Sequence, residues 1–202
     1  MKNGNRLKGI IVALYTPTNV QGGIDIPGLR RLVRFMIDGG IHGIFTMGSM
    51  GGCVFYHREE KLMALEAVLD EAKGQRPVLF GIVENGTKEA MRYAREAEKL
   101  GADALVFTPP GYFGYSERHV VSYFRDLAQA TSLPVYIYNR LDNRLTHKMI
   151  EELRKEDNIV GLKDSSCDFS YFLSLLDEFG SSEDFAIFQG DETVIAQSLI
   201  SG

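Results

Sequence analysis

Residues 77–110 read PVLFGIVENGTKEAMRYAREAEKLGADALVFTPP, and this stretch decides the fold class. Its apolar runs at 78–83 and 104–108 have the length and the Val, Leu, Ile and Phe content of strands. Thr87 can cap a helix between them, and Gly101 can close it. The small and apolar residues of that helix share one face: Ala90, Tyr93, Ala94, Ala97 and Leu100. The stretch therefore predicts a strand, a helix and a second strand parallel to the first.

The same alternation extends along the whole chain. Further runs of strand length lie at 9–15, 43–47, 135–138, 159–162 and 185–188. Most of them are continuously apolar, which is typical of parallel strands buried on both faces. Helical patterns lie between them; one ends at Gly39-Gly40, and Ser116 and Thr146 are candidate N-caps of later helices. The repeat is about 30 residues long, the size of one strand–helix unit.

Strict alternation of strands and helices predicts a parallel sheet that is either doubly wound or closed as a barrel. We expect an α/β fold, the (β/α)8 TIM barrel. The chain has no GxGxxG turn and no P-loop, and polar residues follow several successive strands rather than one switch point.

Only seven strands are apparent, so the barrel looks truncated after its seventh unit. Residues 1–202 are expected to form a single TIM-barrel domain that lacks the eighth strand and the C-terminal helices. Two open strand edges would favour aggregation. The chain is therefore a fragment, or a partner covers the gap, or the fold is open and marginal.

The composition excludes several classes of function. The chain has 202 residues, a net charge of −5 and no basic block, so we expect no nucleic-acid partner. No apolar stretch reaches the roughly 18 residues of a spanning helix, and the first nine residues are polar. We therefore expect no membrane partner, no signal peptide and a cytoplasmic location. Neither the two cysteines nor the four histidines have metal-binding spacing, which predicts no metal site.

Lys163 is the most informative single residue. It follows the apolar run Ile159-Val160-Gly161-Leu162, where a lysine would point into the mouth of a barrel. Burial there disfavours the ammonium form, and a neutral amine can attack a ketone carbonyl to form an imine. The alternative is an ordinary lysine at a strand end, either solvated or paired with Asp164.

Other candidate groups follow neighbouring strands. Tyr138 closes the preceding apolar run, and its phenol could move protons near Lys163; the alternative is a core tyrosine. The turn Gly48-Ser49-Met50-Gly51-Gly52 could bring backbone N–H groups to a carboxylate, or could be only a tight turn. The Pro109-Pro110-Gly111-Tyr112 turn is equally ambiguous. Cys167 is a candidate nucleophile, although a spectator thiol is the simpler interpretation.

Together these segments resemble the dihydrodipicolinate synthase/N-acetylneuraminate lyase family of class I, Schiff-base-forming pyruvate aldolases. The matching motifs occur in the family's order: IIVALYTP at 10–17, GSMG at 48–51, YN at 138–139, IVGLKDSS at 159–166 and GD at 190–191. The resemblance covers almost the whole chain. It implies a (β/α)8 barrel that assembles as a homo-oligomer, either a dimer or a tetramer.

The resemblance also implies roles for individual residues and a chemistry. Lys163 would form the Schiff base, Tyr138 would shuttle protons, and Tyr112 would match a catalytic aromatic that some members lend to a neighbouring subunit. The substrate, pyruvate or another 2-oxo acid, would be bound by Ser49, Met50, Gly51 and Gly190. No metal or organic cofactor is implied, because the lysine itself supplies the electron sink.

Three substitutions depart from the family pattern. Met50 replaces the usual second hydroxyl, Gly52 replaces a Glu, and Arg140-Leu141-Asp142-Asn143-Arg144 replaces Val-Pro-Gly-Arg. The last argues against dihydrodipicolinate synthase itself and weakly favours branches acting on 2-oxo-3-deoxy sugar acids. The leading hypothesis is a Schiff-base lyase catalysing aldol cleavage, condensation or dehydration. The alternative is a catalytically impaired member that binds a small 2-oxo acid or serves as an oligomeric scaffold.

Overall fold

A computed structural model describes residues 7–202 of the chain. Most of the polar N-terminal segment considered above, residues 1–6, lies outside the described residues. The strands are β1 Ile11–Ala13, β2 Gly43–Thr46, β3 Val78–Ile82, β4 Ala104–Phe107, β5 Val135–Arg140, β6 Ile159–Ser165 and β7 Ala186–Gln189. The helices are α1 Ile26–Asp38, α2 Arg58–Ala72, α3 Thr87–Leu100, α4 Glu117–Gln129, α5 His147–Leu153, α6 Phe169–Phe179 and α7 Ile195–Ser201.

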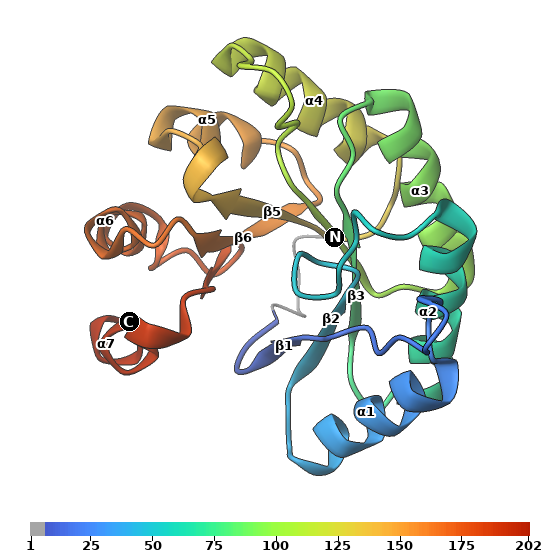
Figure 1. Cartoon of the computed structure of the whole chain (residues 1–202). Helices are drawn as coiled ribbons and strands as arrows, with labels where there is room; N and C mark the ends of the chain where they lie inside the picture. The colour runs from blue at the N-terminus through green and yellow to red at the C-terminus, as the bar shows by residue number, and fades with distance from the viewer. Residues whose placement is uncertain (1–6) are drawn as a thin grey trace.

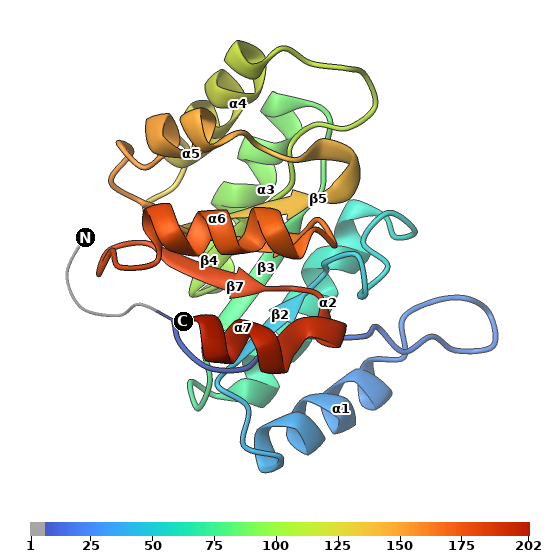
Figure 2. The same ribbon diagram turned by 90° about the vertical axis from the view of Figure 1, so that its left-hand side faces the viewer.

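The seven strands form one parallel sheet in the order β1-β2-β3-β4-β5-β6-β7, with a helix after each strand. The helices follow one another around the outside of the sheet (Figure 1). Seen from the side, α6 lies over β7 with α7 next to it (Figure 2). The predicted α/β barrel architecture with seven strand–helix units is confirmed. Within residues 7–202 the sheet has no eighth strand, and β1 and β7 are its edges.

Two hydrophobic cores lie on the two faces of the sheet. The larger core fills the space between strands and helices, because helices α1 to α6 each turn one apolar face inward. Helix α7 contributes no residue to this core, and its Ile195, Leu199 and Ile200 are exposed. The smaller core lies inside the curved sheet: Phe45, Leu79, Ala104, Val106, Tyr136, Tyr138 and Ala186. Alternate residues of a strand point to opposite faces, so each strand contributes to both cores.

Strand β6 pairs with β5 through a bulge. Val135 is opposite Ile159, but the next residue, Tyr136, is opposite Gly161, so Val160 is an extra residue in β6. The strand can pass this close to Tyr136 only because Gly161 lacks a side chain. A Cβ there would lie 2.6 Å from Cε1 of Tyr136.

The bulge decides which way Lys163 faces. Ile159 packs in the outer core, and simple alternation from it would place Lys163 on the same outer face. The extra residue reverses the alternation, so Leu162 packs in the outer core and Lys163 faces the interior, opposite Tyr138.

Some predicted boundaries are wrong by one to three residues. Helix α3 starts at Thr87 with Gly86 as its N-cap, so Thr87 is not the cap. Glycine serves there because it tolerates the non-helical cap geometry. The predicted caps Ser116 and Thr146 are confirmed, since each side chain accepts a backbone N–H of its helix.

Strands β5 and β6 extend beyond the apolar runs that predicted them, to Arg140 and Ser165. Their last residues are polar, and a criterion based on apolar runs excludes such residues. Asn139 and Asp164 are nevertheless buried within these ends because they hydrogen-bond to each other. Tyr138 and Lys163 therefore lie inside paired strands rather than at their ends.

Candidate active site

Lys163 and Tyr138 are side by side on the inner face of the sheet. They are register partners near the C-terminal ends of β6 and β5. Lys163 Nζ lies 4.5 Å from the centre of the Tyr138 ring and 5.1 Å from the centre of the Phe45 ring on β2. Phe45 and Tyr138 meet edge to face, with their centroids 6.0 Å apart. The amine is thus held between two aromatic side chains at the mouth of the curved sheet.

The ordinary interpretation of Lys163, a pair with Asp164, does not fit this geometry. Asp164 lies on the other face of β6, where its carboxylate accepts hydrogen bonds from Asn139 at 3.0 Å and Ser166 at 2.9 Å. Among the described residues, no carboxylate lies within 4.0 Å of the Lys163 amine. Lys163 is half-buried rather than fully solvated.

A cavity of about 410 Å³ adjoins Tyr138, while Lys163 is not among the residues that line it. Its lining comes from three strand ends and the loops that follow them: Ser49, Tyr138, Arg140, Leu141, Asp142 and Ser165. The predicted residues Ser49 and Tyr138 are therefore brought together. Arg140 and Asp142 form an ion pair in its wall, with Arg140 Nε 3.2 Å and Nη2 3.3 Å from the two carboxylate oxygens. The cavity thus has a charged end beyond Tyr138.

The Gly-rich turn packs closely against the strand ends through its backbone at Gly51. The hydroxyl of Thr16, in the loop after β1, donates to the carbonyl of Gly51 at 2.8 Å. A Cβ on Gly51 would lie 3.1 Å from the backbone nitrogen of Met47, so this residue must be small. Ser49 and Met50 are exposed at the tip of the turn. Close packing explains the glycine, and carboxylate binding by this turn remains a prediction.

Gly190 borders Lys163 from the end of β7. A Cβ at Gly190 would lie 2.8 Å from Lys163 Cε and 2.1 Å from Ser165 Oγ. Its backbone N–H donates to the carbonyl of Asp164 at 2.6 Å. Glycine at position 190 therefore leaves room for the aliphatic part of the Lys163 side chain. This packing explains the glycine without any contact to the substrate.

Tyr112 is not among the residues that line the cavity. Its side chain is 77% exposed and packs against Phe113, with the ring centroids 4.7 Å apart. The loop is anchored, because Asn85 Oδ1 accepts the N–H groups of Gly111 and Tyr112, each at 3.0 Å. A role for Tyr112 in the site of a neighbouring subunit remains a prediction.

Arg140, Asp142 and Ser165 line the cavity but were not predicted as site residues. Arg140 follows Tyr136 and Tyr138 at the two-residue spacing of one strand face, which is the signal that could have identified it. That signal was hidden because the apolar run of β5 stops at residue 138.

The two cysteines are not among the residues that line the cavity. Cys53 is buried, and burial raises the pKa of its thiol, which disfavours the nucleophilic thiolate. Cys167 is exposed on the loop before α6. Across residues 7–202, His, Cys, Asp and Glu form no group of three that could hold a metal ion. The same residues contain no helix with the length and apolar character needed to span a membrane.

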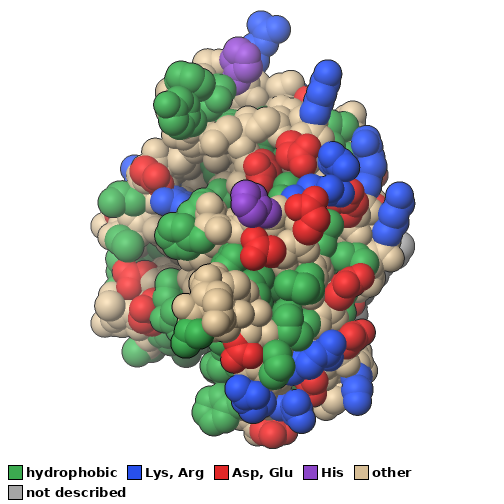
Figure 3. Space-filling model, turned by 45° about the vertical axis from the view of Figure 1, so that its right-hand side comes forward, with side chains coloured by type: hydrophobic (Ala, Val, Ile, Leu, Met, Phe, Trp, Pro, Cys, Tyr) green, Lys and Arg blue, Asp and Glu red, His purple; other side chains and the backbone are tan. Residues whose placement is uncertain are grey.

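The surface drawn in Figure 3 has Lys and Arg side chains interspersed with Asp and Glu. Charged side chains of neighbouring helices also form ion pairs, such as Arg30 on α1 with Asp70 on α2 at 2.9 Å. This face therefore has no continuous basic patch of the kind that nucleic-acid binding requires.

The model of the dihydrodipicolinate synthetase family matches residues 6–202. This chain belongs to the dihydrodipicolinate synthetase family. The resemblance inferred from the ordered motifs is confirmed. Family relatives are named as synthases and lyases, so the family is one of aldolase-type lyases.

Individual relatives of the dihydrodipicolinate synthetase family resemble the chain over most of its length. A 4-hydroxy-tetrahydrodipicolinate synthase from Ectopseudomonas mendocina is 31% identical over 199 residues, 97% of this chain and 68% of the relative. An N-acetylneuraminate lyase from Mediterraneibacter gnavus is 32% identical over 170 residues, 82% of this chain and 54% of the relative.

A solved structure of the family also resembles the chain in its three-dimensional fold. The dihydrodipicolinate synthase from Acinetobacter baumannii, complexed with pyruvate, has a TM-score of 0.93 and 28% identity. The match covers 98% of this chain and 68% of that chain. Seven strand–helix units of this chain thus superpose on a family barrel.

Proposed function

We propose that this protein is a class I lyase that forms a Schiff base between Lys163 and pyruvate or a related 2-oxo acid. The observation that carries the proposal is the placement of the Lys163 amine, 4.5 Å from the Tyr138 ring at the mouth of the curved sheet. A family relative was solved with pyruvate bound, which supports a small 2-oxo acid as the substrate class.

The chemistry starts at the Lys163 nitrogen. The neutral amine adds to the C2 carbonyl carbon, and one of its protons moves to the oxygen. A second proton, delivered to that hydroxyl from solvent through the Tyr138 phenol, lets water leave and gives a protonated imine. The imine nitrogen then accepts the electron pair released when the C3–C4 bond breaks or when a proton leaves C3. The resulting enamine takes up a proton or adds to an aldehyde, and water then releases the product and restores the amine.

The surroundings of Lys163 suit a cationic intermediate. The rings of Phe45 and Tyr138 lie within 5.1 Å of its nitrogen, and aromatic faces attract a positive charge. The protonated imine would occupy the same place. Tyr138 also lines the cavity, where its phenol can exchange protons with the substrate oxygen.

The charged end of the cavity would bind the distal part of the substrate. Arg140 offers N–H donors, and Asp142 offers carboxylate acceptors, on the side of the cavity beyond Tyr138. Such a pair can bind hydroxyl groups, because it supplies both donors and acceptors. We therefore propose a 2-oxo acid with a polar distal fragment as the larger substrate.

The proposal is tested by trapping the imine. The protein is incubated with pyruvate and borohydride, and the reduced adduct is mapped by mass spectrometry. We expect one adduct at Lys163, no trapping by Lys163→Ala, and unchanged trapping by a Lys155→Ala control, since Lys155 is exposed after α5. An adduct at another lysine, or none in the folded wild-type protein, would refute the proposal.

A binding-only protein is the second candidate function. Met50 is 48% exposed where the family usually has a hydroxyl, and Gly52 has a φ of 66°, which disfavours the side chain that relatives have there. Saturable pyruvate binding that persists in Lys163→Ala, without turnover of any 2-oxo acid, would favour this candidate. Measurable turnover by the wild-type protein would exclude it.

We also propose that the chain forms a homo-oligomer. Two loops at the same end of the sheet carry large apolar side chains that are mostly exposed: Val54, Phe55, Tyr112 and Phe113. Large apolar side chains gathered on one exposed surface are typical of protein contacts. Sedimentation equilibrium of the wild-type chain and of Phe113→Ser tests this proposal; a monomeric wild-type chain would contradict it.

A further inference from the structure

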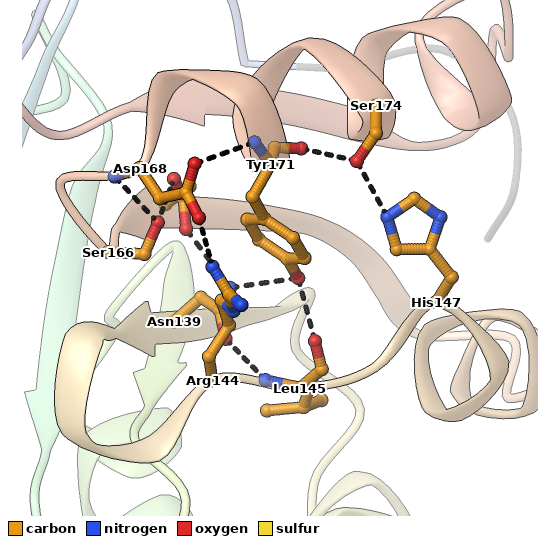
Figure 4. A network of polar contacts seen from close by, with 9 residues as sticks. Asn139, Arg144, Leu145, His147, Ser166, Asp168, Tyr171 and Ser174 are labelled. Carbon is orange, nitrogen blue, oxygen red and sulfur yellow. Dashed lines mark hydrogen bonds and ion pairs between the residues drawn. The ribbon is translucent and has the colours of Figure 1, made fainter.

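Two polar side chains lie directly behind the Lys163–Tyr138 pair. Asn139 follows Tyr138 in β5, and Asp164 follows Lys163 in β6, so these two are also register partners. Successive side chains of a strand point to opposite faces. Tyr138 and Lys163 face the cavity side, while Asn139 and Asp164 face the helices, as Figure 4 shows for the labelled Asn139 and its partners.

Asn139 is completely buried, and both polar atoms of its amide have hydrogen-bond partners. Its Nδ2 donates to Asp164 Oδ1 at 3.0 Å and to the hydroxyl of Tyr171 at 3.1 Å. Its Oδ1 accepts the backbone N–H of Leu145 at 2.8 Å. One side chain of β5 therefore binds β6, α6 and the loop before α5 together (Figure 4).

Asp164 is only 1% exposed, and its partners are all neutral groups or a distant cation. Its second oxygen accepts the hydroxyl of Ser166 at 2.9 Å. Burial raises the pKa of the Asp164 carboxyl, while the hydrogen bonds from Ser166 and Asn139 and the charge of Arg144 act in the opposite direction. Burying such a group is expensive, which indicates that its hydrogen bonds serve a specific arrangement.

The outer part of the network is fixed by α6. The Tyr171 hydroxyl donates to the carbonyl of Leu145 at 2.8 Å, and Arg144 lies over the Tyr171 ring at 4.4 Å. Arg144 also pairs with Asp168 at 2.7 Å, and Asp168 caps α6 by accepting the N–H of Tyr171. The strand ends are thus tied to a helix rather than left to fray (Figure 4).

We propose that Asn139 and Asp164 are positioning residues that hold the ends of β5 and β6 in register, and thereby hold Lys163 against Tyr138. Because β6 already contains a bulge, its end could slip by one residue, and such a slip would turn Lys163 to the outer face. The hydrogen bond between the two buried side chains opposes that slip. This inference rests on the proposed function for its catalytic consequence but not for its geometry.

The test uses Asn139→Ala with two readouts. The first is the rate at which acetic anhydride labels Lys163 relative to the exposed lysines, which reports the setting of the amine without any substrate. The second is the rate of borohydride trapping as a function of pyruvate concentration. We expect the relative labelling of Lys163 to change several-fold. The limiting trapping rate should fall about 100-fold, because misplacing a reacting group by about 1 Å has that effect.

Asn158→Ala is the matched control. Asn158 precedes β6 at the other end of the strand, and the two N–H groups of its Nδ2 are shared among three carbonyls, those of Ala128, Thr131 and Leu133. Its loss should destabilise the protein comparably and leave both Lys163 readouts unchanged. If Asn158→Ala alters them as much as Asn139→Ala does, the effect is only one of stability and the proposal is wrong.

Asp164→Asn separates geometry from charge. The new amide can still accept from Asn139 and can donate to Ser166, so we expect labelling and trapping close to those of the wild type. If Asn139→Ala does not fold, Ser166→Ala removes the 2.9 Å bond to Asp164, together with the longer 3.4 Å bond from the Asp168 N–H, and should give a smaller change in the same direction.

Wild-type labelling of Lys163 that no variant of the network changes would overturn the proposal. Absence of trapping by the wild-type protein would instead refute the proposed function, while the labelling readout still decides the role of the pair.

Discussion

Substitution of Gly161 by alanine tests the bulge that turns Lys163 inward. A Cβ at this position would lie 2.6 Å from Tyr136 Cε1 and 2.6 Å from the backbone carbonyl oxygen of Ala186. Neither the Tyr136 ring nor the Ala186 carbonyl can move away from the added methyl group without disturbing its own packing or pairing. The Tyr136 ring is buried against Phe188, with the centroids 6.0 Å apart, and the carbonyl belongs to β7.

The expected cost follows from overpacking. Inserting a methyl group into a packed core costs about 1–3 kcal/mol. For a chain of this length, each kcal/mol lowers Tm by about 2–4 °C. We therefore expect Gly161→Ala to lower the free energy of unfolding by about 1–3 kcal/mol. It should also slow the trapping of pyruvate, because relief of the clash must shift β6 or β7 beside Lys163.

Urea denaturation of Gly161→Ala and of a control, Gly114→Ala, measures this effect. Gly114 has nothing within 4 Å of a built Cβ, so the control should change the free energy of unfolding by less than about 0.5 kcal/mol. Tyr136→Leu should relieve part of the clash, making the double variant less destabilised than the sum of the two single variants. Equal stability and equal trapping in Gly161→Ala and Gly114→Ala would refute the account of the bulge.

Three further predictions concern the site. Gly190→Ala should slow trapping and cost about 1–3 kcal/mol by denaturation, since its Cβ would lie 2.8 Å from Lys163 Cε; a wild-type trapping rate would contradict this. Arg140→Ala should raise KM for 2-oxo acids with a polar distal fragment and leave the concentration dependence of pyruvate trapping unchanged; equal effects on both would show that Arg140 does not bind the distal end. Burial raises the pKa of Asp164, so the folded chain binds this proton more tightly than the unfolded chain. The free energy of unfolding of the wild type should therefore fall, relative to that of Asp164→Asn, as pH rises from about 3.8 through the raised pKa. Denaturation of both proteins at a series of pH values measures this difference, and parallel pH profiles would argue against it.

Local periodicity predicted the elements well and the ends of the strands poorly. Apolar runs located all seven strands of residues 7–202, because parallel strands buried on both faces are continuously apolar. The same rule stopped β5 at residue 138 and β6 at residue 162, since the residues beyond are polar. Those polar ends are where the cavity and the network behind it are built, so the rule failed at the site itself.

The candidate residues were predicted unequally. Position and resemblance predicted Lys163, Tyr138 and Ser49. In the structure, Tyr138 lies beside the Lys163 amine and lines the same cavity as Ser49. Arg140 and Asp142 were noted only as a departure from the family pattern, although they form the charged end of the cavity. Asn139 and Asp164 stand next to the catalytic candidates in the sequence, yet nothing local indicates that they meet.

The sequence by itself determined the alternation of strands and helices, the family and the identity of the candidate lysine. The alternation depends on patterns within about 30 residues, the length of one repeat, and the family and the lysine depend on short motifs in a set order along the chain. Only the tertiary structure decided that Lys163 faces the inside of the curved sheet, opposite Tyr138. The orientation depends on a bulge in the pairing of β5 with β6, whose partners Asn139 and Asp164 are 25 residues apart in the sequence. It also depends on Gly161, which leaves room for the Tyr136 ring. Register between strands is set by packing across the sheet, and packing of that kind leaves no periodic signal in the chain.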